Sequence, residues 1–554
     1  MDATATIPSY MCSTGNGPRQ LLLQPLEKMT LGQFDGMPVK QAQSHIDAQL
    51  RYFNESVRIL IREGYRLKEL RNALAPINSL PEEVLIEIFY IVAKTSIADI
   101  VRISRVCRHW RAIALASPKL WTNITLTKLP RAATFLRRSK NVALTYHIER
   151  IERTNSHRID ERQLRRAVAP ARMRCLKASL FDAGDMDQLI STLDSPAPYL
   201  QELSLRLLKA DNYTIELGLE TIQTLFGDST PSLRSLTLKQ ISISWTSGLY
   251  SNLAHLSVTD LSQEWLPSVD RFLEVLVQCP SLQTLDIQCL RDELPIIYEG
   301  QPASRAQRVQ LPLLENLTFS YVPKGWLASV LDGVSLTSRT VMKLLALHDT
   351  EDRMRPYTML PENRSHLPLF SNTRRFEIFS SEERLVIQLH QDASTPFIEP
   401  SCTIELHDII PEVAFANAFS CFSLNDVEAL VLCEPSPSSA IATKQQWTSM
   451  LREIPNLSSI RIIDFDSNVL SALLKALRMP GEGGLRICPQ LKHLDIVGVS
   501  ETTDELKNEL VECVRFLSSA GCPLETVELM DLKGWSDEDV NNLRDIGVDV
   551  AFND

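Results

Sequence analysis

An eight-residue tract of the form P-x-L-x-x-L-x-L recurs through most of this 554-residue chain. Leu, Ile, Val or Phe fills the three apolar positions of every copy, and where the array is regular the tracts start 20 to 34 residues apart. Nine copies at such spacing indicate a repeat architecture. The copies occupy residues 198–205, 231–238, 251–258, 280–287, 312–319, 425–432, 455–462, 489–496 and 522–529.

Each tract predicts a short strand, because the alternate residues of its L-x-L pair face the same side. The segments between tracts, such as 269–278 and 502–517, have helical spacing. One strand and one helix cannot bury their own apolar faces, so the copies must stack on one another. The pattern therefore predicts an α/β fold. It resembles a leucine-rich-repeat solenoid over residues 123–554, in an irregular form that lacks the usual Asn or Cys position in most copies.

The period weakens between Tyr321 and Leu424. Three segments there, 375–379, 384–390 and 403–407, still alternate like strands. They predict two to three degenerate repeats with an inserted loop around 349–371. A loop of that length in a compact array is often functional or disordered.

Residues 1–40 are rich in proline and glycine without a sustained period, and predict a disordered tail. Residues 41–75 predict one amphipathic helix that ends before Pro76. Its apolar residues supply half of a coiled-coil seam. The stripe could serve self-association or pack on the rest of the same chain. Its members are Ile46, Leu50, Phe53, Val57, Leu60, Leu67 and Leu74, with Gly64 and Arg71 interrupting the seam.

Three short helices are predicted next: one that follows Ser79 and carries apolar residues through Val92, and two over 97–106 and 107–115. Ser79 is a candidate N-cap of the first, Pro81 suits its first turn, and Glu82 and Glu83 suit the positive end of its dipole. Pro118 stops the third helix.

Residues 76–122 resemble the F-box, the three-helix module that docks substrate receptors on the Skp-type adaptor of cullin–RING ubiquitin ligases. The preceding helix and following repeats resemble the expanded F-box family of mushroom-forming fungi. Ile97, Ile100 and Ile103 stand where leucine is more usual, a volume-conserving change. The residues that carry the resemblance, or that it implies as adaptor-binding, are Leu80, Pro81, Glu83, Val84, Leu85, Ile88, Phe89, Ile100, Val106, Cys107, Trp110, Leu120 and Trp121.

The resemblance implies a substrate-recognition subunit of a Skp–cullin–F-box ligase. The F-box would bind the Skp-type adaptor through apolar contacts and the repeats would hold a protein target. Some F-box side chains must instead form the module's own core, and the sequence does not divide the two groups. An alternative is an F-box and repeat scaffold that acts outside ubiquitination.

The net charge of −11 is unevenly distributed. Residues 99–177 hold 19 Lys/Arg and 5 Asp/Glu, whereas 497–554 hold 4 and 14. The basic stretch from Arg102 to Lys177 leaves nucleic-acid binding as a third hypothesis, although no nucleic-acid motif accompanies it. Complementarity within the chain and solubility are the simpler explanations.

No phosphate-loop, dinucleotide, nucleophile-elbow, zinc-protease or paired CxxC motif occurs in the chain. We expect no catalysis, cofactor or metal. Without a signal-like segment or a long apolar run, we expect a cytoplasmic or nuclear protein that does not contact membranes. Trp245, Trp265, Trp326 and Trp447 lie outside the leucine pattern and are candidates for interface anchors or for core-edge packing.

Overall fold

A computed structural model of the chain describes residues 31–95, 97–126, 129–149, 161–208, 222, 224–291, 307–347, 355–381, 384–393, 399–433, 443–479, 486–499, 502–519 and 524–553. The chain divides into two compact units. Unit 1 is Met1–Trp121 and unit 2 is Thr122–Asp554. Of the disordered tail predicted over 1–40, residues 1–30 lie outside the described part.

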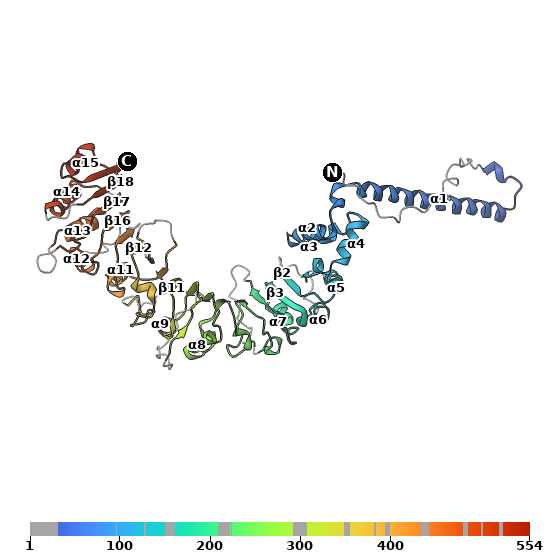
Figure 1. Cartoon of the computed structure of the whole chain (residues 1–554), viewed down its shortest axis with the longest axis horizontal. Coiled ribbons are helices and arrows are strands. Elements are labelled where there is room, and N and C mark those ends of the chain that lie inside the picture. Colours follow the sequence, from blue (N-terminus) through green and yellow to red (C-terminus); the bar gives the residue numbers. More distant parts are fainter. Residues whose placement is uncertain are drawn as a thin grey trace, which may run out of the picture. The chain divides into compact units, whose positions relative to one another are not determined.

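Unit 1 is helical (Figure 1). Its helix α1 starts two residues before the predicted helix and ends at Ala73, before Pro76. The three short helices lie where the apolar spacing places them, with Cys107 as the N-cap of the third. The elements are η2 (Leu31–Phe34), α1 (Val39–Ala73), η3 (Pro76–Ser79), α2 (Glu82–Thr95), α3 (Ile97–Ile103), α4 (Arg108–Ala116) and η4 (Pro118–Trp121).

Unit 2 is a mixed α/β structure built on one large sheet. Its strands are β1 (Asn123–Thr125), β2 (Leu144–Glu149), β3 (Met173–Leu180), β4 (Glu202–Leu207), β5 (Ser235–Lys239), β6 (His255–Leu261), β7 (Thr284–Cys289), β8 (Val309–Gln310), β9 (Asn316–Ser320), β10 (Val334–Ser335), β11 (Val341–Leu347), β12 (Arg375–Ser381), β13 (Arg384–His390), β14 (Cys402–His407), β15 (Ala429–Cys433), β16 (Ser459–Ile463), β17 (His493–Val499), β18 (Thr526–Leu532) and β19 (Asp549–Asn553). Its α-helices are α5 (Leu129–Arg138), α6 (Glu161–Ala167), α7 (Ala183–Ile190), α8 (Val269–Val277), α9 (Lys324–Gly333), α10 (Pro368–Ser371), α11 (Pro411–Cys421), α12 (Lys444–Arg452), α13 (Ser467–Leu477), α14 (Asp504–Ser519) and α15 (Asp537–Arg544), and its 3-10 helices are η5 (Pro170–Arg172), η6 (Phe226–Asp228), η7 (Gly248–Tyr250) and η8 (Gln263–Trp265).

The nine tracts supply strands that pair in register. Leu203 lies beside Leu236, which lies beside Leu256, and the same row continues to Leu285 and Leu317. All 27 apolar side chains at the three repeated positions are at most 2% exposed. Each tract therefore buries its apolar side chains against those of its neighbours, which is what the repeat spacing predicts.

Helices cover one side of the sheet (Figure 1). Successive helices pack side by side, as in α11·α12, α12·α13 and α13·α14. The apolar side chains of each strand point toward these helices, and the alternate side chains form the opposite face of the sheet.

The region of weak period differs from the prediction. Its three strands form as expected, but β13 runs antiparallel to both β12 and β14. β14 pairs in parallel with β11, and β12 pairs in parallel with β15. The spatial order is therefore β11-β14-β13-β12-β15, an inserted antiparallel meander rather than successive repeats. Alternation predicts a strand but does not fix its direction.

The loop expected around 349–371 is packed where the structure describes it, from Arg355 onward. Tyr357, Met359 and Phe370 are buried there. The Tyr357 hydroxyl donates to the carbonyl of Ala414 at 2.7 Å. The segment therefore belongs to the core under the meander. Residues 348–354 lie outside the described part.

A buried ion cluster ties the meander together. The Glu377 carboxylate on β12 pairs with Arg375, and its Oε2 lies 3.4 Å from His390 Nε2 on β13. Burial by itself would raise the pKa of Glu377, but His390 and Arg375 outweigh it and hold that pKa below its usual value. Glu377 is therefore ionised at neutral pH.

Replacing Glu377 with Gln should destabilise unit 2 at pH 7 by about 2–3 kcal/mol, because the buried Arg375 charge would lie against a neutral amide in place of the Glu377 carboxylate. A depressed pKa stabilises the fold above the unfolded-state value, and this contribution is lost as the pH falls through the folded-state value. The difference in melting temperature between wild type and variant should therefore narrow as the pH falls below about 4.5.

Glu428→Gln, immediately before neighbouring β15, is the matched control, because its pair with Arg374 is exposed. We expect it to change stability by less than about 0.5 kcal/mol. Equal effects of the two substitutions would contradict a special role for the buried cluster.

Candidate adaptor-docking module and sheet face

The first turn of α2 begins differently from the prediction. Ser79 is not the N-cap, because it ends the 3-10 turn η3 and its hydroxyl donates to the Pro76 carbonyl at 2.6 Å. The Pro81 carbonyl instead accepts from the amides of Val84 and Leu85, each at 3.1 Å. Leu80 is extended and 37% exposed. The chain thus presents Leu80 and Pro81 at the surface just before the helix.

Five of the thirteen predicted site residues form the core of unit 1. Leu85, Phe89, Ile100, Leu120 and Trp121 are each at most 3% exposed. The Trp121 indole donates to the Ala114 carbonyl at 2.7 Å, which anchors the end of the module to α4. These five can act on a partner only through the exposed residues that they position.

Trp110 links α4 to the segment before α2. Its indole Nε1–H donates to Asn78 Oδ1 at 2.6 Å, and the Asn78 amide donates to the Asn72 carbonyl at 2.6 Å. Its ring packs on Phe89 with centroids 4.9 Å apart. Cys107 caps α4, since its sulfur accepts from the Trp110 amide. Trp110 and Cys107 are half-buried and fix the geometry of the module.

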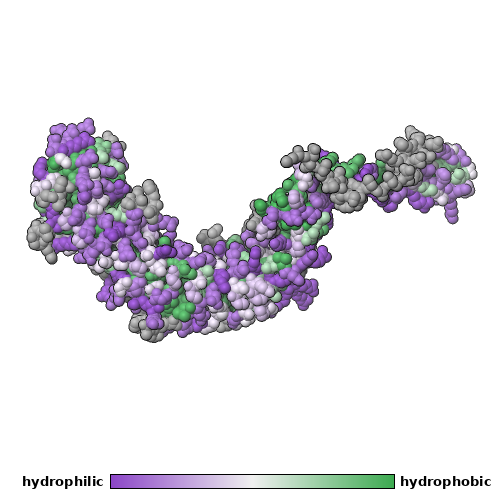
Figure 2. Space-filling view, viewed as in Figure 1, coloured by the Kyte–Doolittle hydropathy of each residue, from purple (hydrophilic) through white to green (hydrophobic). Residues whose placement is uncertain are grey.

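A second face of α2 is apolar and exposed. Val84, Ile88 and Ile91 follow at spacings of four and three, so they share one side of the helix. Val84 is 43% exposed and Ile91 62%, while Ile88 is half-buried. This side adjoins the buried side that carries Leu85 and Phe89. Hydrophobic residues gather at the surface around α2 in Figure 2.

The remaining predicted site residues and three additional apolar residues are also exposed. Pro81 and Glu83 are exposed, and so is Val106. Ile77, Ile91 and Val92 were not among the predicted site residues, although the helical spacing after Val84 could have indicated Ile91. We define the docking face as Leu80, Pro81, Val84, Ile88, Ile91 and Val92.

Several of the described basic residues beyond α2 are exposed, and part of their charge is compensated by ion pairs. Arg102 pairs with Asp99 at 2.7 Å, and Arg108 pairs with Glu69 of α1 at 2.7 Å. On β3, Lys177 pairs with Glu202 at 2.7 Å. Pairing of this kind accounts for part of the basic stretch without a nucleic-acid partner.

Side chains on the open face of the sheet change from polar to apolar along unit 2. One row follows the last apolar position of each tract. In β4 to β6 its side chains are Arg206, Lys239 and Thr259, and after an irregularity in β6 it continues in β7 and β9 with Gln288 and the buried Ser320. In β12 and β15 to β18 the paired row is Phe379, Cys433, Ile463, Val497 and Met530, all half-buried.

Charged residues border this apolar row. Arg461 donates to Asp495 at 3.0 Å and lies 3.9 Å from Glu528, both on the adjacent row. Exposed Asp464 and Asp531 follow the row at the strand ends. We call Phe379, Cys433, Ile463, Val497 and Met530 the apolar row.

The tryptophans proposed as anchors are mostly internal. Trp245, Trp326 and Trp447 are at most 8% exposed, and Trp265 is half-buried. Trp326 packs on Phe272 with centroids 5.0 Å apart.

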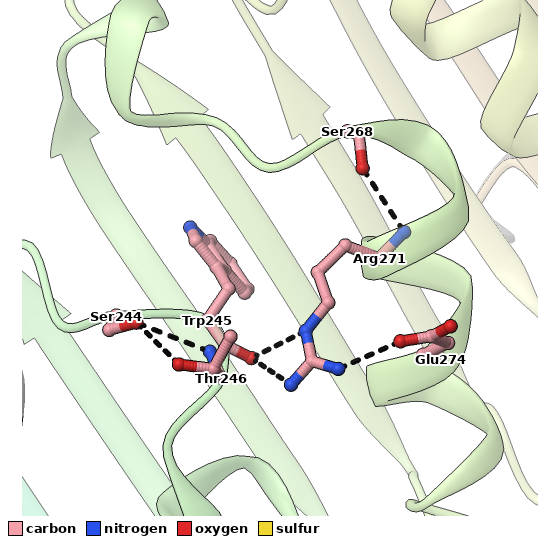
Figure 3. A network of polar contacts seen from close by, with 6 residues as sticks. All are labelled: Ser244, Trp245, Thr246, Ser268, Arg271 and Glu274. Carbon is pink, nitrogen blue, oxygen red and sulfur yellow. Dashed lines mark hydrogen bonds and ion pairs between the residues drawn. The ribbon is translucent and has the colours of Figure 1, made fainter.

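The backbone at Trp245 is held by α8. Arg271 Nη2 donates to the Trp245 carbonyl at 2.8 Å and its Nη1 to Glu274 at 2.7 Å (Figure 3). The indole of Trp245 in turn donates to the Trp265 carbonyl at 3.0 Å. These contacts fix a loop to α8 and support a core-edge role.

The described residues contain no cluster of three or more His, Cys, Asp or Glu side chains placed to hold a metal ion. Burial, with Glu202 beside it, raises the pKa of the Cys175 thiol to about 12. Burial likewise raises the pKa of Cys488 to about 12. Both thiols are therefore protonated at neutral pH. Within the described ranges, no helix has the length and apolarity to cross a bilayer.

Trp110→Phe should loosen unit 1 while leaving its ring packing in place, because the Asn78 oxygen loses its donor. An unmatched polar group costs about 1–2 kcal/mol, so amide exchange in α2 should quicken about fivefold or more. Hydrogen-exchange mass spectrometry of α2 peptides measures this. Trp535→Phe in unit 2 is the matched control, and equal exchange in α2 for both variants would contradict the assignment.

Residues 77–127 match the F-box-like family model. The match covers the whole of α2, α3 and α4 and includes every predicted adaptor-binding residue. A search of curated proteins finds no match to the chain. The three-helix part of unit 1 is thus an F-box-like domain.

Proposed function

We propose that the chain is the non-catalytic substrate-recognition subunit of a Skp–cullin–F-box type ubiquitin ligase. The observation that carries the proposal is an F-box-like domain whose core is closed but whose α2 presents a second, exposed apolar side. Apolar side chains left exposed beside a complete core are typical of a docking surface. The chain would then act in the cytoplasm or nucleus, where such ligases work.

Docking would bury the docking face against the Skp-type adaptor. Leu80 and Pro81 lie just before α2, and Val84, Ile88 and Ile91 continue along it, so one partner surface could cover all five. The core residues Leu85 and Phe89 would hold α2 in place and would not themselves contact the adaptor.

We further propose that unit 2 is an irregular leucine-rich-repeat solenoid that binds a protein target. The in-register tracts with helices on one side support this architecture. The apolar row supports the choice of surface, because the equivalent row in the first half of the sheet is polar. The target segment would offer apolar side chains to the row and Lys or Arg to Asp464, Asp531 and Glu528.

Val84→Glu should weaken binding of a purified Skp-type adaptor about tenfold or more, because it places a charge in a contact that must be dry. Leu80→Ala/Pro81→Ala should weaken it similarly. Calorimetry measures both. Val277→Glu is the matched control, since Val277 lies at the end of α8 in unit 2 and is 53% exposed.

Wild type that does not bind the adaptor, or Val84→Glu and Val277→Glu variants that bind equally well, would overturn the proposal. Adaptor binding with no cullin in the complex recovered from cells would point to a scaffold outside ubiquitination.

The apolar row can be tested with the adaptor contact disabled, so that targets accumulate. Proximity labelling under proteasome block would compare Val84→Glu alone with Val84→Glu carrying Ile463→Glu and Val497→Glu. We expect a subset of labelled proteins to disappear with the row variant. The control carries Thr259→Glu and Gln288→Glu, at the equivalent positions of the polar row. Identical labelling in the row variant and the control would contradict target binding there.

A further inference from the structure

Helix α1 carries an apolar stripe that nothing in the described part of the chain buries. Its 35 residues include no buried side chain. Leu50, Phe53, Leu60 and Leu67 are 45–57% exposed. The contacts that α1 makes with the following segment lie near the C-terminal end of α1. There Glu69 pairs with Arg108, and the Asn72 carbonyl accepts from the side-chain amide of Asn78.

The stripe has the spacing of a coiled-coil seam. Counting in sevens, one core position (d) is held by Val39, Ile46, Phe53, Leu60, Leu67 and Leu74. The other (a) is held by Gln43, Leu50, Val57, Gly64 and Arg71. One column is thus wholly apolar, whereas the other contains a glycine and an arginine. This mismatch constrains how two such helices can face each other.

We propose that α1 is a dimerisation helix that pairs antiparallel with α1 of a second copy of this chain, with Phe53 of each copy packed against Gly64 of the other. In this register Leu50 faces Leu67 and Val57 faces Leu60. Every a residue meets a d residue, so the large ring of Phe53 lies where Gly64 leaves room. Each contact occurs twice, because the pair is two-fold symmetric.

Charge selects the same register. In an antiparallel pair, the residue that follows a d position lies beside the corresponding residue of the second helix. The two are displaced by two residues along the helix axis. Asp47 then lies beside Lys68 of the second copy, and Arg71, opposite Ile46, lies next to the same Asp47. Shifting the register by one heptad toward the N-terminus would place Lys40 beside Lys68 of the second copy. A shift of one heptad the other way would place Glu63, which stands before an a position, beside Glu63 of the second copy. A parallel pair would place Gly64 on Gly64 and Arg71 on Arg71.

The length of the seam suits a stable pair. Contacts run from residue 43 to residue 74, which at 1.5 Å per residue is about 48 Å of helix. A two-stranded contact of this length provides several apolar layers in its centre, with Arg71 and Gln43 near its ends. Isologous contacts of this kind are the commonest route to a homodimer.

The test is the mass of the full chain in solution, measured by sedimentation across a concentration series. Wild type should approach twice the 62.5 kDa chain mass. Asp47→Lys or Lys68→Asp alone should raise the dissociation constant about tenfold, since each creates two like-charge contacts. The double exchange Asp47→Lys/Lys68→Asp should bring the constant back to within about threefold of wild type, because the Asp–Lys pair is restored while Arg71 still lies beside position 47.

Arg62→Asp is the matched control, because position 62 lies on the outer side of the helix in this register and carries the same change of charge. It should leave the dissociation constant within about twofold of wild type. Phe53→Glu should give a monomer, and a thermal melt close to wild type would show that it folds.

A monomeric wild type at tens of micromolar would overturn the proposal and indicate that residues 1–30 or unit 2 cover the stripe. Dimers in which the double exchange fails to rescue the single variants would overturn the antiparallel register. Neither result bears on adaptor binding, which is measured with the docking-face variants.

Discussion

The burial of three apolar side chains per tract, in register with those of the next tract, is the constraint on which unit 2 depends. No single strand and helix could bury these side chains alone, so the sheet exists only because the spacing repeats. Leu236, for example, lies between Leu203 and Leu256 in the same row. The side chains that point the other way are free of this constraint. They can therefore change from Arg206 and Lys239 at one end to Ile463 and Val497 at the other without disturbing the core.

Unit 1 contains a small helical domain in which one helix, α2, carries apolar residues on two sides. The side of α2 with Leu85 and Phe89 closes the core, with Trp110 and Trp121 held by hydrogen bonds to Asn78 and Ala114. The side with Val84 and Ile91 contributes little to that core and stays exposed. The division gives the F-box-like domain a closed interior and a separate, exposed apolar side.

Much of this arrangement could be predicted from the sequence. The tracts identify nine strands because the alternation and the repeat agree, and Pro76 and Pro118 mark helix ends because proline stops helices locally. The reversed strand β13 could not be predicted, since alternation is the same in either direction. The prediction of Ser79 as the N-cap was wrong, because its hydroxyl donates to the Pro76 carbonyl within the preceding 3-10 turn. Whether Val84 or Leu85 faces inward depends on where α3 and α4 pack, which local spacing does not contain.

We propose that the F-box-like domain binds a Skp-type adaptor through the docking face while unit 2 remains available for a target. Hydrogen exchange of the full chain, with and without a saturating amount of the adaptor, tests it most directly. We expect slower exchange in peptides within residues 77–121 and unchanged exchange in the strands of unit 2. Protection centred on the strands of unit 2, or no protection anywhere, would contradict it.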